Sequence, residues 1–446
     1  MARLIEPRTL KGFRDYPPAL MIPRERLMET ARGVFRSYGF APIDTPALEY
    51  TEVLLAKVDD GAEVRKQLYR FEDAGGRDVA LRFDLTVPLA RFVSQHAQEL
   101  GLPFKRYHLG PVWRGENTQA GRYREFAQCD FDTIGSTDNA ADTEIAMVMC
   151  DLLVALGFDR FEVRVNNRRV LNGLLTQLGL APEAATPVLR ALDKLAKIGD
   201  DAVFAEMQRE AGATAEQAEA IVALARTTGT NAEVLDALEL RFAGNPAALD
   251  GVACLRQLCE VAVTAGIPPH QIRVDLSICR GLDYYTGTVF ETFLTDLPGI
   301  GSVCSGGRYD DLTGRYTKQA LPGVGASLGL DRLIAAMEQL GMLDGAVATA
   351  APVLVTRFDR DRLGDYQRVA RRLREAGIGA EVYPDAKKLG TQLAYGERKG
   401  FRVALIAGGD EFAAGTWKVK DLAARTEEVV GDLDVVSAVA ALLVPA

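Results

Sequence analysis

Hydrophobic and polar positions follow different patterns in successive parts of this chain, and the first 134 residues change from a helical pattern to a strand pattern. Residues 23–38 place apolar side chains on one helical face, and Gly39 is expected to end the helix. Residues 40–49 form an extended stretch with prolines that suits an edge strand. Between about residue 78 and residue 134 the pattern is mostly period two, which predicts antiparallel sheet.

The middle of the chain has helical spacing instead. Residues 182–248 are rich in Ala, Leu and Glu, and Thr214 stands three residues before Gln217. That spacing is typical of a capping box at the start of a helix. A strand is predicted at 273–279, where apolar and polar residues alternate again. The helices are therefore predicted to form an insertion between two parts of a sheet.

The tail begins after a stretch of small residues at 341–352, which predicts a linker. The elements expected beyond it are a strand at 353–357, a helix at 363–376, a strand at 380–383, a helix at 391–400 and a strand at 402–406. This alternation is typical of a small α/β domain.

The composition narrows the class of protein. With 446 residues and 48% hydrophobic residues, the chain can form two or three domains with real cores. The net charge of −9 argues against a protein that coats nucleic acid indiscriminately, because such binding needs cations that neutralise phosphates. The sequence shows neither a secretory leader nor an apolar run of bilayer length, so a soluble cytoplasmic protein without a membrane partner is expected.

Cysteine and histidine usage argues against two kinds of chemistry. The six cysteines are scattered and form no CxxC pair, which indicates reduced thiols and not a zinc site. The chain has three histidines, His96, His108 and His270, so few residues could act as a histidine base in catalysis.

In each of two predicted strands, polar residues stand at every second position and therefore lie on the same face of the strand. In residues 81–86, Arg82, Asp84 and Thr86 alternate with apolar residues. In residues 126–132, Gln128, Asp130 and Asp132 share a face in the same way. The pattern fits either a polar ligand site or the solvent-facing side of an antiparallel sheet, and at this point both interpretations stay open.

The loop at residues 114–126 joins two of the predicted strands and concentrates charge around glycines. It carries three arginines, among them Arg114 and Arg122, and acids that include Glu116. Such a loop can hold a triphosphate with its magnesium, because guanidinium groups donate in pairs to phosphate oxygens. The chain has neither of the Gly-rich phosphate-binding motifs, so arginines are expected to supply the positive charge.

Two further segments carry candidate chemistry. Residues 280–291 bring Arg280, an acid, Tyr284 and Tyr285 to the end of the predicted strand at 273–279. A guanidinium there can bind a carboxylate or phosphate, and phenols can orient a small polar ligand. Residues 323–333 are predicted to form a Gly-rich entry into a helix that carries Arg332 about two turns in. Alone, Arg332 is typical of a helix surface.

Together these segments resemble the histidyl-tRNA synthetases. The RGLDYYTGTVFE run at 280–291 resembles the signature of that family, and residues 43–46, 114–126 and 323–332 resemble motifs 1, 2 and 3 of class II aminoacyl-tRNA synthetases. The segments stand in family order across nearly the whole chain. No ligase for another amino acid, and no histidine-binding regulatory subunit of the same fold, accounts equally well for this run together with the retained arginines.

The resemblance implies an α+β fold, in which a class II antiparallel-sheet catalytic core with a helical insertion precedes a C-terminal α/β anticodon-binding domain. The implied divisions are a first part of the core at 1–170, the helical insertion at 171–268, a second part of the core at 269–340, a linker at 341–351 and the anticodon-binding domain at 352–446.

The resemblance also implies a histidine site. Asp84 and Thr86, with Gln128, are expected to bind the α-ammonium group of L-histidine. Asp132 and one of the two tyrosines, Tyr284 or Tyr285, are expected to bind the imidazole. Asp84 and Asp132 stand where other members of the family carry glutamate, and Ala127 stands where an aromatic residue or histidine is frequent.

The implied ATP site uses arginines. Arg114 is expected at the α-phosphate, Arg332 at the γ-phosphate, and Glu116 and Arg122 elsewhere on the loop. Arg280 is expected to bridge the histidine carboxylate and the α-phosphate. Mg²⁺ is expected with ATP and not in a site built by the protein alone, although Glu116 could contact it. The expected partners are tRNA(His) and a second copy of the chain in a homodimer, and no DNA.

Overall fold

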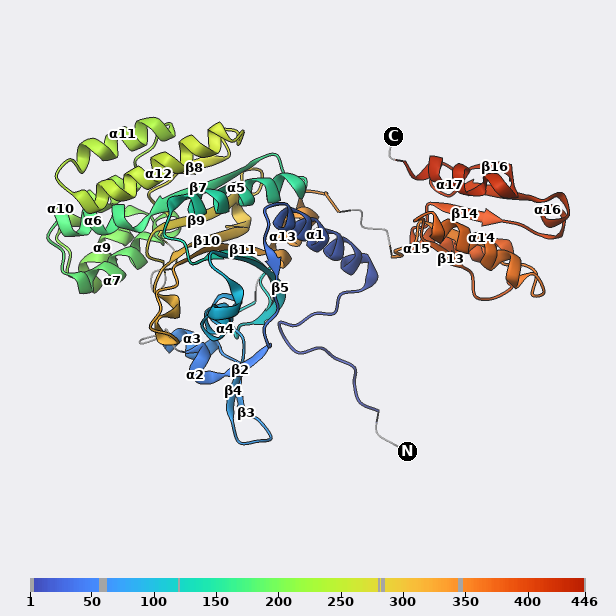
Figure 1. Ribbon diagram of the computed structural model, residues 1–446, viewed down its shortest axis with the longest axis horizontal. Helices are drawn as coiled ribbons and strands as arrows, with labels where there is room; N and C mark the ends of the chain where they lie inside the picture. The colour runs from blue at the N-terminus through green and yellow to red at the C-terminus, as the bar shows by residue number, and fades with distance from the viewer. Residues whose placement is uncertain are drawn as a thin grey trace. The chain divides into compact units, whose positions relative to one another are not determined.

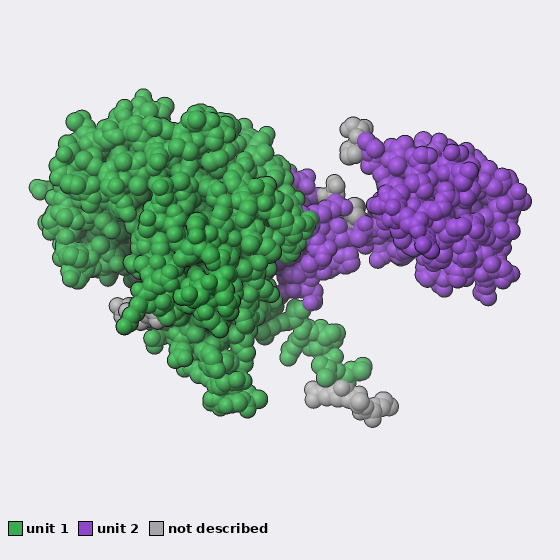
Figure 2. Space-filling model, in the orientation of Figure 1, with its two compact units in different colours: residues 1–13, 27–340 green, residues 14–26, 341–446 purple. Residues whose placement is uncertain are grey.

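The computed structural model describes residues 4–55, 62–118, 121–279, 281, 285–343 and 348–444. The chain divides into two compact units (Figure 2). The first comprises residues 1–13 and 27–340, and the second comprises residues 14–26 and 341–446. None of the helices in the described ranges has the length and apolar character needed to cross a membrane.

An eight-stranded sheet organises the first unit (Figure 1). In spatial order its strands are β1 (Ala41–Pro42), β5 (Phe104–Trp113), β6 (Glu125–Ile134), β11 (Gly323–Gly329), β10 (Cys304–Tyr309), β9 (Thr288–Leu294), β7 (Phe161–Asn167) and β8 (Ile272–Val274). Only the pairs at the two ends, β1 with β5 and β7 with β8, are parallel. The predicted antiparallel core and the proline-bearing edge strand are confirmed.

Helices pack on this sheet through their apolar faces. Helix α5 (Asn139–Ala155) is capped by Asp138, whose side chain accepts a hydrogen bond from the Ala140 N–H group. The helix buries Ile145, Met149 and their apolar neighbours, and it packs on β7 and β9–β11. Helix α1 (Pro18–Ser37) begins five residues before the predicted start, and Gly39 follows it with a positive φ of 79°.

A small three-stranded sheet of β2 (Leu48–Tyr50), β4 (Asp78–Leu81) and β3 (Arg70–Glu72) packs on the short helix α2 (Thr51–Leu54). The short helix α3 (Ala62–Gln67) precedes β3 along the chain. The strand predicted at 81–86 is wrong. β4 ends at Leu81, and helix α4 (Thr86–Leu100) occupies part of the segment predicted as sheet. The reason is local, because Asp84 Oδ1 accepts hydrogen bonds from the N–H groups of Thr86 (3.1 Å) and Val87 (2.9 Å) and so starts a helix.

The predicted strand at 273–279 is likewise too long. β8 ends at Val274, and Asp275 Oδ1 then accepts hydrogen bonds from the Ser277 N–H (3.0 Å) and hydroxyl (2.6 Å). This local turn competes with the strand ladder. The chain therefore leaves the sheet before it reaches the Arg280 segment.

The helical segment lies at the β7–β8 end of the sheet (Figure 1). Its helices are α6 (Arg168–Gln177), α7 (Ala185–Leu192), α8 (Leu195–Ile198), α9 (Asp200–Ala211), α10 (Ala215–Ala225), α11 (Asn231–Arg241) and α12 (Pro246–Thr264). The predicted capping box is confirmed, since the Gln217 N–H group donates to Thr214 Oγ1 (3.2 Å) and the Thr214 N–H group to Gln217 Oε1 (2.8 Å). Thr230 and Glu233 form a second one at the start of α11.

The second unit carries a five-stranded sheet in the order β13 (Ala380–Val382), β12 (Val353–Val355), β14 (Val403–Ile406), β15 (Thr416–Asp421) and β16 (Thr426–Gly431). Helices α14 (Leu363–Glu375), α15 (Leu389–Lys399), α16 (Gly409–Ala414) and α17 (Val435–Leu443) accompany it. The predicted α/β alternation is confirmed. Buried Tyr366 donates its hydroxyl to the Ala407 carbonyl (2.9 Å), and Trp417 Nε1 donates to Asp432 (2.9 Å).

Candidate active site

Polar side chains gather on one face of the central strands because their positions pair across the sheet. In one row, Arg106 of β5 pairs with Asp132 of β6, Asp132 with Gly325 of β11, and Gly325 with Gly307 of β10. A parallel row begins with His108 and continues through Asp130, Ser327 and Ser305. Directly paired residues share a face of a sheet, so these two rows form the floor of one site.

Asp132 is the most constrained group of this floor. Its Oδ2 atom lies 2.6 Å from Nη2 of Arg106, and its Oδ1 atom accepts a hydrogen bond from the Tyr309 hydroxyl. Asp132 and Arg106 are buried, at 3% and 0% exposed. A Cβ atom at Gly325 would lie 2.1 Å from Asp132 Oδ1, so only glycine at this position leaves room for the carboxylate.

Burial changes the ionisation of the floor. It raises the pKa of Asp130 to about 7, an effect that the charge of Arg106 opposes. It also raises the pKa of Asp132, and Arg106 and the Tyr309 hydroxyl oppose that rise. Burial, then the nearby cations Arg106 and Arg82, lower the pKa of His108 to about 3. His108 is therefore uncharged at neutral pH.

The predicted ammonium-binding residues come from two elements. Gln128 lies on β6 and donates from Nε2 to the Ser327 hydroxyl (2.8 Å). Asp84 and Thr86 lie in the turn before α4 and at the first residue of that helix. The charge of Asp84 contributes to raising the pKa values of Asp130 and Asp132, which places the three carboxylates in one neighbourhood.

Arg82 lies at the β5 side of this face, where a Cβ atom at Gly110 would lie 2.6 Å from its Nη2 atom. Its side chain is buried and donates to the carbonyls of Pro111 (2.9 Å) and Thr45 (2.6 Å). It therefore ties the segment after β4 to β5 and to the segment after β1.

Arg114 stands at the end of β5, beside the same group of acids. Its Nε atom donates to the Phe83 carbonyl (3.0 Å), and its guanidinium lies over the rings of Phe83 (4.4 Å) and Phe126 (5.2 Å). Burial lowers the pKa of Arg114, and the charges of Asp84 and Glu116 oppose this effect. The guanidinium is thus fixed in orientation between two aromatic faces.

The rest of the arginine loop meets α13 (Leu330–Gln339). Glu116 and Arg122 form an ion pair within the loop. A Cβ atom at Gly121 would lie 3.4 Å from the Cα atom of Arg332, so the end of the loop and the start of α13 are in close approach. Arg332 Nη1 donates to the Ser302 carbonyl (2.6 Å), and Asp331 Oδ2 accepts from the Ala127 N–H group (2.9 Å).

The prediction for residues 323–333 is therefore wrong in part. Residues 323–329 are strand β11, and Arg332 lies in the first turn of α13 and not two turns in. The glycines of β11 make space for side chains of neighbouring strands, because a Cβ atom at Gly323 would lie 2.4 Å from the Tyr309 ring.

The predicted residues Arg280 and Tyr284 lie outside the described residues. Tyr285 is described, and a Cβ atom at Gly307 would lie 2.8 Å from its ring, so the ring covers the glycine end of the floor. Burial raises the pKa of Tyr285, and the charges of Asp132, Asp130 and Asp84 add to this rise. The structure thus brings Tyr285 together with all three acids.

No site role was expected from the sequence for five residues of this region, which are Arg106, His108, Ser305, Ser327 and Tyr309. Each becomes visible only through the pairing of strands that are distant in the sequence. Along residues 104–113, the alternation of a strand puts Arg106 and His108 on one face, and this alternation is the sequence feature that could have pointed to them.

No metal centre forms from protein groups alone in the part of the chain that the structure describes. No three or more His, Cys, Asp or Glu side chains gather there in a way that could hold an ion. In the arginine loop, the carboxylate of Glu116 already pairs with Arg122.

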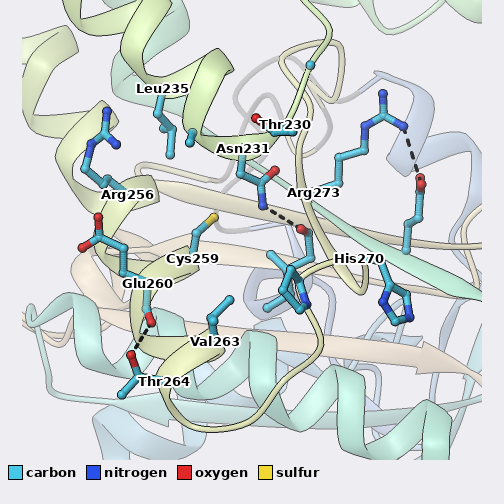
Figure 3. Close-up of a pocket in the computed structure, with 15 residues that line it drawn as sticks. Thr230, Asn231, Leu235, Arg256, Cys259, Glu260, Val263, Thr264, His270 and Arg273 are labelled. Atoms are coloured by element: carbon cyan, nitrogen blue, oxygen red, sulfur yellow. Dashed lines mark hydrogen bonds and ion pairs between the residues drawn. The ribbon is translucent and has the colours of Figure 1, made fainter.

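A separate cavity of about 780 Å³ opens among α11, α12 and β8 (Figure 3). None of the predicted site residues lines it. Within it, Asn231 donates to the Ile272 carbonyl (2.8 Å) and accepts from the Val274 N–H group (2.9 Å), so its side-chain amide pairs with the edge strand of the sheet. Arg256 is neutralised there by Asp236 (2.7 Å) and Glu239 (2.8 Å).

Comparison with known proteins gives consistent matches over the whole chain. The family model for histidyl-tRNA synthetase matches residues 12–333, and the anticodon binding domain model matches residues 353–442. The chain is 58% identical over 427 residues to the histidine–tRNA ligase of Rhodopirellula baltica, covering 96% of each protein. It is 47% identical over 421 residues to that of Wolinella succinogenes, covering 94% of each.

Solved structures agree with these matches. The crystal structure of histidyl-tRNA synthetase from Nostoc sp. PCC 7120 superposes with a TM-score of 0.91 at 33% identity, over 99% of this chain and 100% of that one. A Bacillus halodurans protein described as an ATP phosphoribosyltransferase regulatory subunit/histidyl-tRNA synthetase has a TM-score of 0.72 at 21% identity, which shows the fold alone.

The antiparallel sheet, the arginine-bearing hairpin loop of β5 and β6 and the helix after β11 define the catalytic core of a class II aminoacyl-tRNA synthetase. A C-terminal α/β anticodon-binding domain follows it. Within that class, the chain belongs to the histidyl-tRNA synthetase family. The family and the fold expected from the sequence are thereby confirmed.

Proposed function

We propose that this chain is a histidine–tRNA ligase that works in two steps. In the first, a carboxylate oxygen of L-histidine attacks the α-phosphorus of ATP, and the bond to the β-phosphate breaks to release pyrophosphate. In the second, a hydroxyl of the terminal ribose of tRNA(His) attacks the carbonyl carbon, and AMP leaves. The observation that carries this proposal is the 58% identity over 96% of the chain to a histidine–tRNA ligase.

The floor of the sheet supports binding of histidine. Asp132, fixed by Arg106 and Tyr309, offers a carboxylate that can accept a hydrogen bond from an imidazole N–H group. Tyr285, or Tyr284, completes the imidazole site in this proposal. A buried site built to bond both ring nitrogens rejects analogues that lack them, since its own polar groups would be left unpaired.

The ammonium group of histidine is assigned to the acidic side of the same floor. Asp84 uses Oδ1 to cap α4, and Oδ2 is directed to the ammonium in this proposal. Thr86 and Gln128 supply further acceptors. The raised pKa of Asp130 supports this assignment, because a bound cation relieves the cost of ionising neighbouring buried carboxylates.

The arginines are assigned to ATP. Arg114 would donate to the α-phosphate and Arg332 to the γ-phosphate, with Glu116 and Arg122 on the loop between them. Arg280 would bridge the histidine carboxylate and the α-phosphate. Catalysis then consists of positioning and of charge stabilisation as pyrophosphate leaves, and it requires no protein nucleophile.

Mg²⁺ enters this proposal with ATP. The described residues supply no carboxylate cluster for it, so phosphate oxygens would provide most of its ligands. Glu116 could contribute only by leaving its ion pair with Arg122. Bound there, the ion would neutralise charge on the β- and γ-phosphates.

The roles proposed for the C-terminal domain, the location and the oligomeric state rest on membership of the family. The C-terminal domain would read the anticodon of tRNA(His), and the chain would act in the cytoplasm as a homodimer. The divisions proposed for the chain stay at 1–170, 171–268, 269–340, 341–351 and 352–446.

The test is ATP–pyrophosphate exchange by the purified protein with each of the twenty amino acids, beside an Arg280→Ala variant. Exchange with histidine alone, lost in the variant, is the expected result. Binding of histidine without exchange for any amino acid would contradict the proposal and favour a regulatory protein that only binds histidine.

A further inference from the structure

A tight turn near the N-terminus lies against the arginine loop. The Phe13 N–H group donates to the Leu10 carbonyl (3.0 Å), which closes a turn over Lys11 and Gly12. Gly12 has a φ of 86°, in the left-handed region that disfavours other residues. No role was expected for this segment from the sequence alone.

Arg124 joins the turn to both ends of the loop. Its N–H group donates to the Gly12 carbonyl (2.8 Å), and its Nη1 atom donates to the Lys11 carbonyl (3.4 Å). Its Nε atom donates to the carbonyl of Glu116 (3.2 Å), and its own carbonyl accepts from the Arg114 N–H group (2.8 Å). A displacement of Arg124 therefore moves the backbone of both Arg114 and Glu116.

Space at Gly12 is limited by the same side chain. A Cβ atom there would lie 2.7 Å from Cγ and Cδ of Arg124 and 3.0 Å from Cγ2 of Thr118. Across the loop, Gly115 donates to the Gln67 carbonyl (2.7 Å), and Gly121 approaches Arg332. The loop is thus held at its start, at its end and against α13, with the turn on one side.

We propose that the turn at Leu10–Phe13 is a positioning element for the ATP-binding loop, and that Arg124 is a positioning residue and not a phosphate ligand. This rests on the proposed function, in which the loop binds ATP. The guanidinium of Arg124 is oriented by two main-chain carbonyls, whereas Arg114 and Arg122 carry the charge offered to phosphates.

The test is Gly12→Ala beside Gly39→Ala, assayed by histidine-dependent ATP–pyrophosphate exchange in the full-length protein. Gly39 is a matched control, because its φ of 79° imposes similar backbone strain while a Cβ atom there would meet nothing within 4 Å. We expect Gly12→Ala to raise the KM for ATP about tenfold and leave the KM for histidine unchanged. Gly39→Ala should change neither KM.

Arg124→Ala tests the same contact from the other side. It should raise the KM for ATP, and Gly12→Ala added to it should have little further effect, because the two contacts at 2.7 Å with Cγ and Cδ of Arg124 are then gone and only the longer contact with Thr118 is left. Equal changes in both KM values, or an unchanged KM for ATP in both variants, would overturn the inference alone. Absence of exchange by the unaltered protein would overturn the proposed function, and this inference with it.

Discussion

Arg106 and Asp132 lie opposite each other on β5 and β6, and Nη2 of the arginine is 2.6 Å from Oδ2 of the aspartate. Both side chains are almost completely buried, with exposures of 0% for the arginine and 4% for the aspartate. Loss of one partner would leave the other charge buried and unpaired. Such changes cost far more than the loss of a surface pair, because water cannot solvate the remaining charge.

Arg106→Met is therefore expected to lower the free energy of unfolding by about 3–5 kcal/mol, measured by urea denaturation. Arg160→Met is the control, since Arg160 pairs with Asp296 at the surface, and its cost should be below about 1 kcal/mol. Similar losses in the two variants would contradict the importance of the buried pair.

Gly325→Ala is expected to impair histidine binding selectively. The new Cβ atom would lie 2.1 Å from Asp132 Oδ1, and the carboxylate must move away from the position assigned to the imidazole. The KM for histidine in pyrophosphate exchange should rise by about tenfold or more, with the KM for ATP nearly unchanged. In Gly299→Ala, where a Cβ atom meets nothing within 4 Å, both constants should stay at the wild-type level.

Asp130 is expected to make stability depend on pH. Burial raises its pKa to about 7 in the folded protein, whereas the unfolded value is near 4. The folded state therefore holds a proton between these values that the unfolded state lacks, and the stabilisation present at low pH is lost as pH rises through 7.

Asp130→Asn removes this titration. As pH rises from 5 to 8, the free energy of unfolding of the variant should increase by about 3 kcal/mol relative to that of the wild type. Urea denaturation of both proteins at the two pH values measures the difference. Parallel pH profiles would show that Asp130 is not the group responsible.

Arg332→Gln is expected to weaken ATP use without affecting histidine. The variant keeps a polar side-chain amide but loses the positive charge assigned to the γ-phosphate. The KM for ATP should rise about tenfold. Arg209→Gln, which removes an exposed ion pair with Glu210, serves as the control for general loss of charge. A change in the KM for histidine of equal size would count against the assignment.

Asn231 is expected to stabilise the edge of the main sheet. Asn231→Ala leaves the Ile272 carbonyl and the Val274 N–H group without the side-chain partner shown in Figure 3, at a cost of about 1–3 kcal/mol. Asn231→Asp retains the acceptor for Val274 but loses the donor to Ile272. If urea denaturation shows that Asn231→Ala and Asn231→Asp are both as stable as the wild type, the Asn231 amide does not stabilise the β8 edge of the sheet.

Local sequence signals were sufficient where an element is stabilised by its own residues. The capping box at Thr214 and the alternation of the C-terminal domain are examples, because the partners lie within a few residues of one another. Asp84 shows the limit of this approach. Alternation and helix capping are both local signals there, and parity alone could not decide between them.

The parts that were missed depend on contacts between distant segments. A glycine-rich run predicts a loop or the start of a helix, yet residues 323–329 form a strand. Glycines are needed there because the side chains of Asp132 and Tyr309 fill the space that other residues would occupy. From the sequence alone, Arg106 would be expected to face solvent. Only the pairing of β5 with β6 places it beside Asp132. Such neutralisation of a buried charge becomes visible only in three dimensions.

β11 fills the space between β6 and β10, and it is the last of the eight strands along the chain. During synthesis, the middle of this sheet therefore emerges from the ribosome after both of its neighbours. Until residues 323–329 are available, β6 and β10 each present an open edge, which is the state of a sheet most exposed to wrong pairing. Completion of the floor that contains Asp130 and Asp132 thus coincides with completion of this sheet, so the proposed histidine site first exists when β11 has paired with both neighbours.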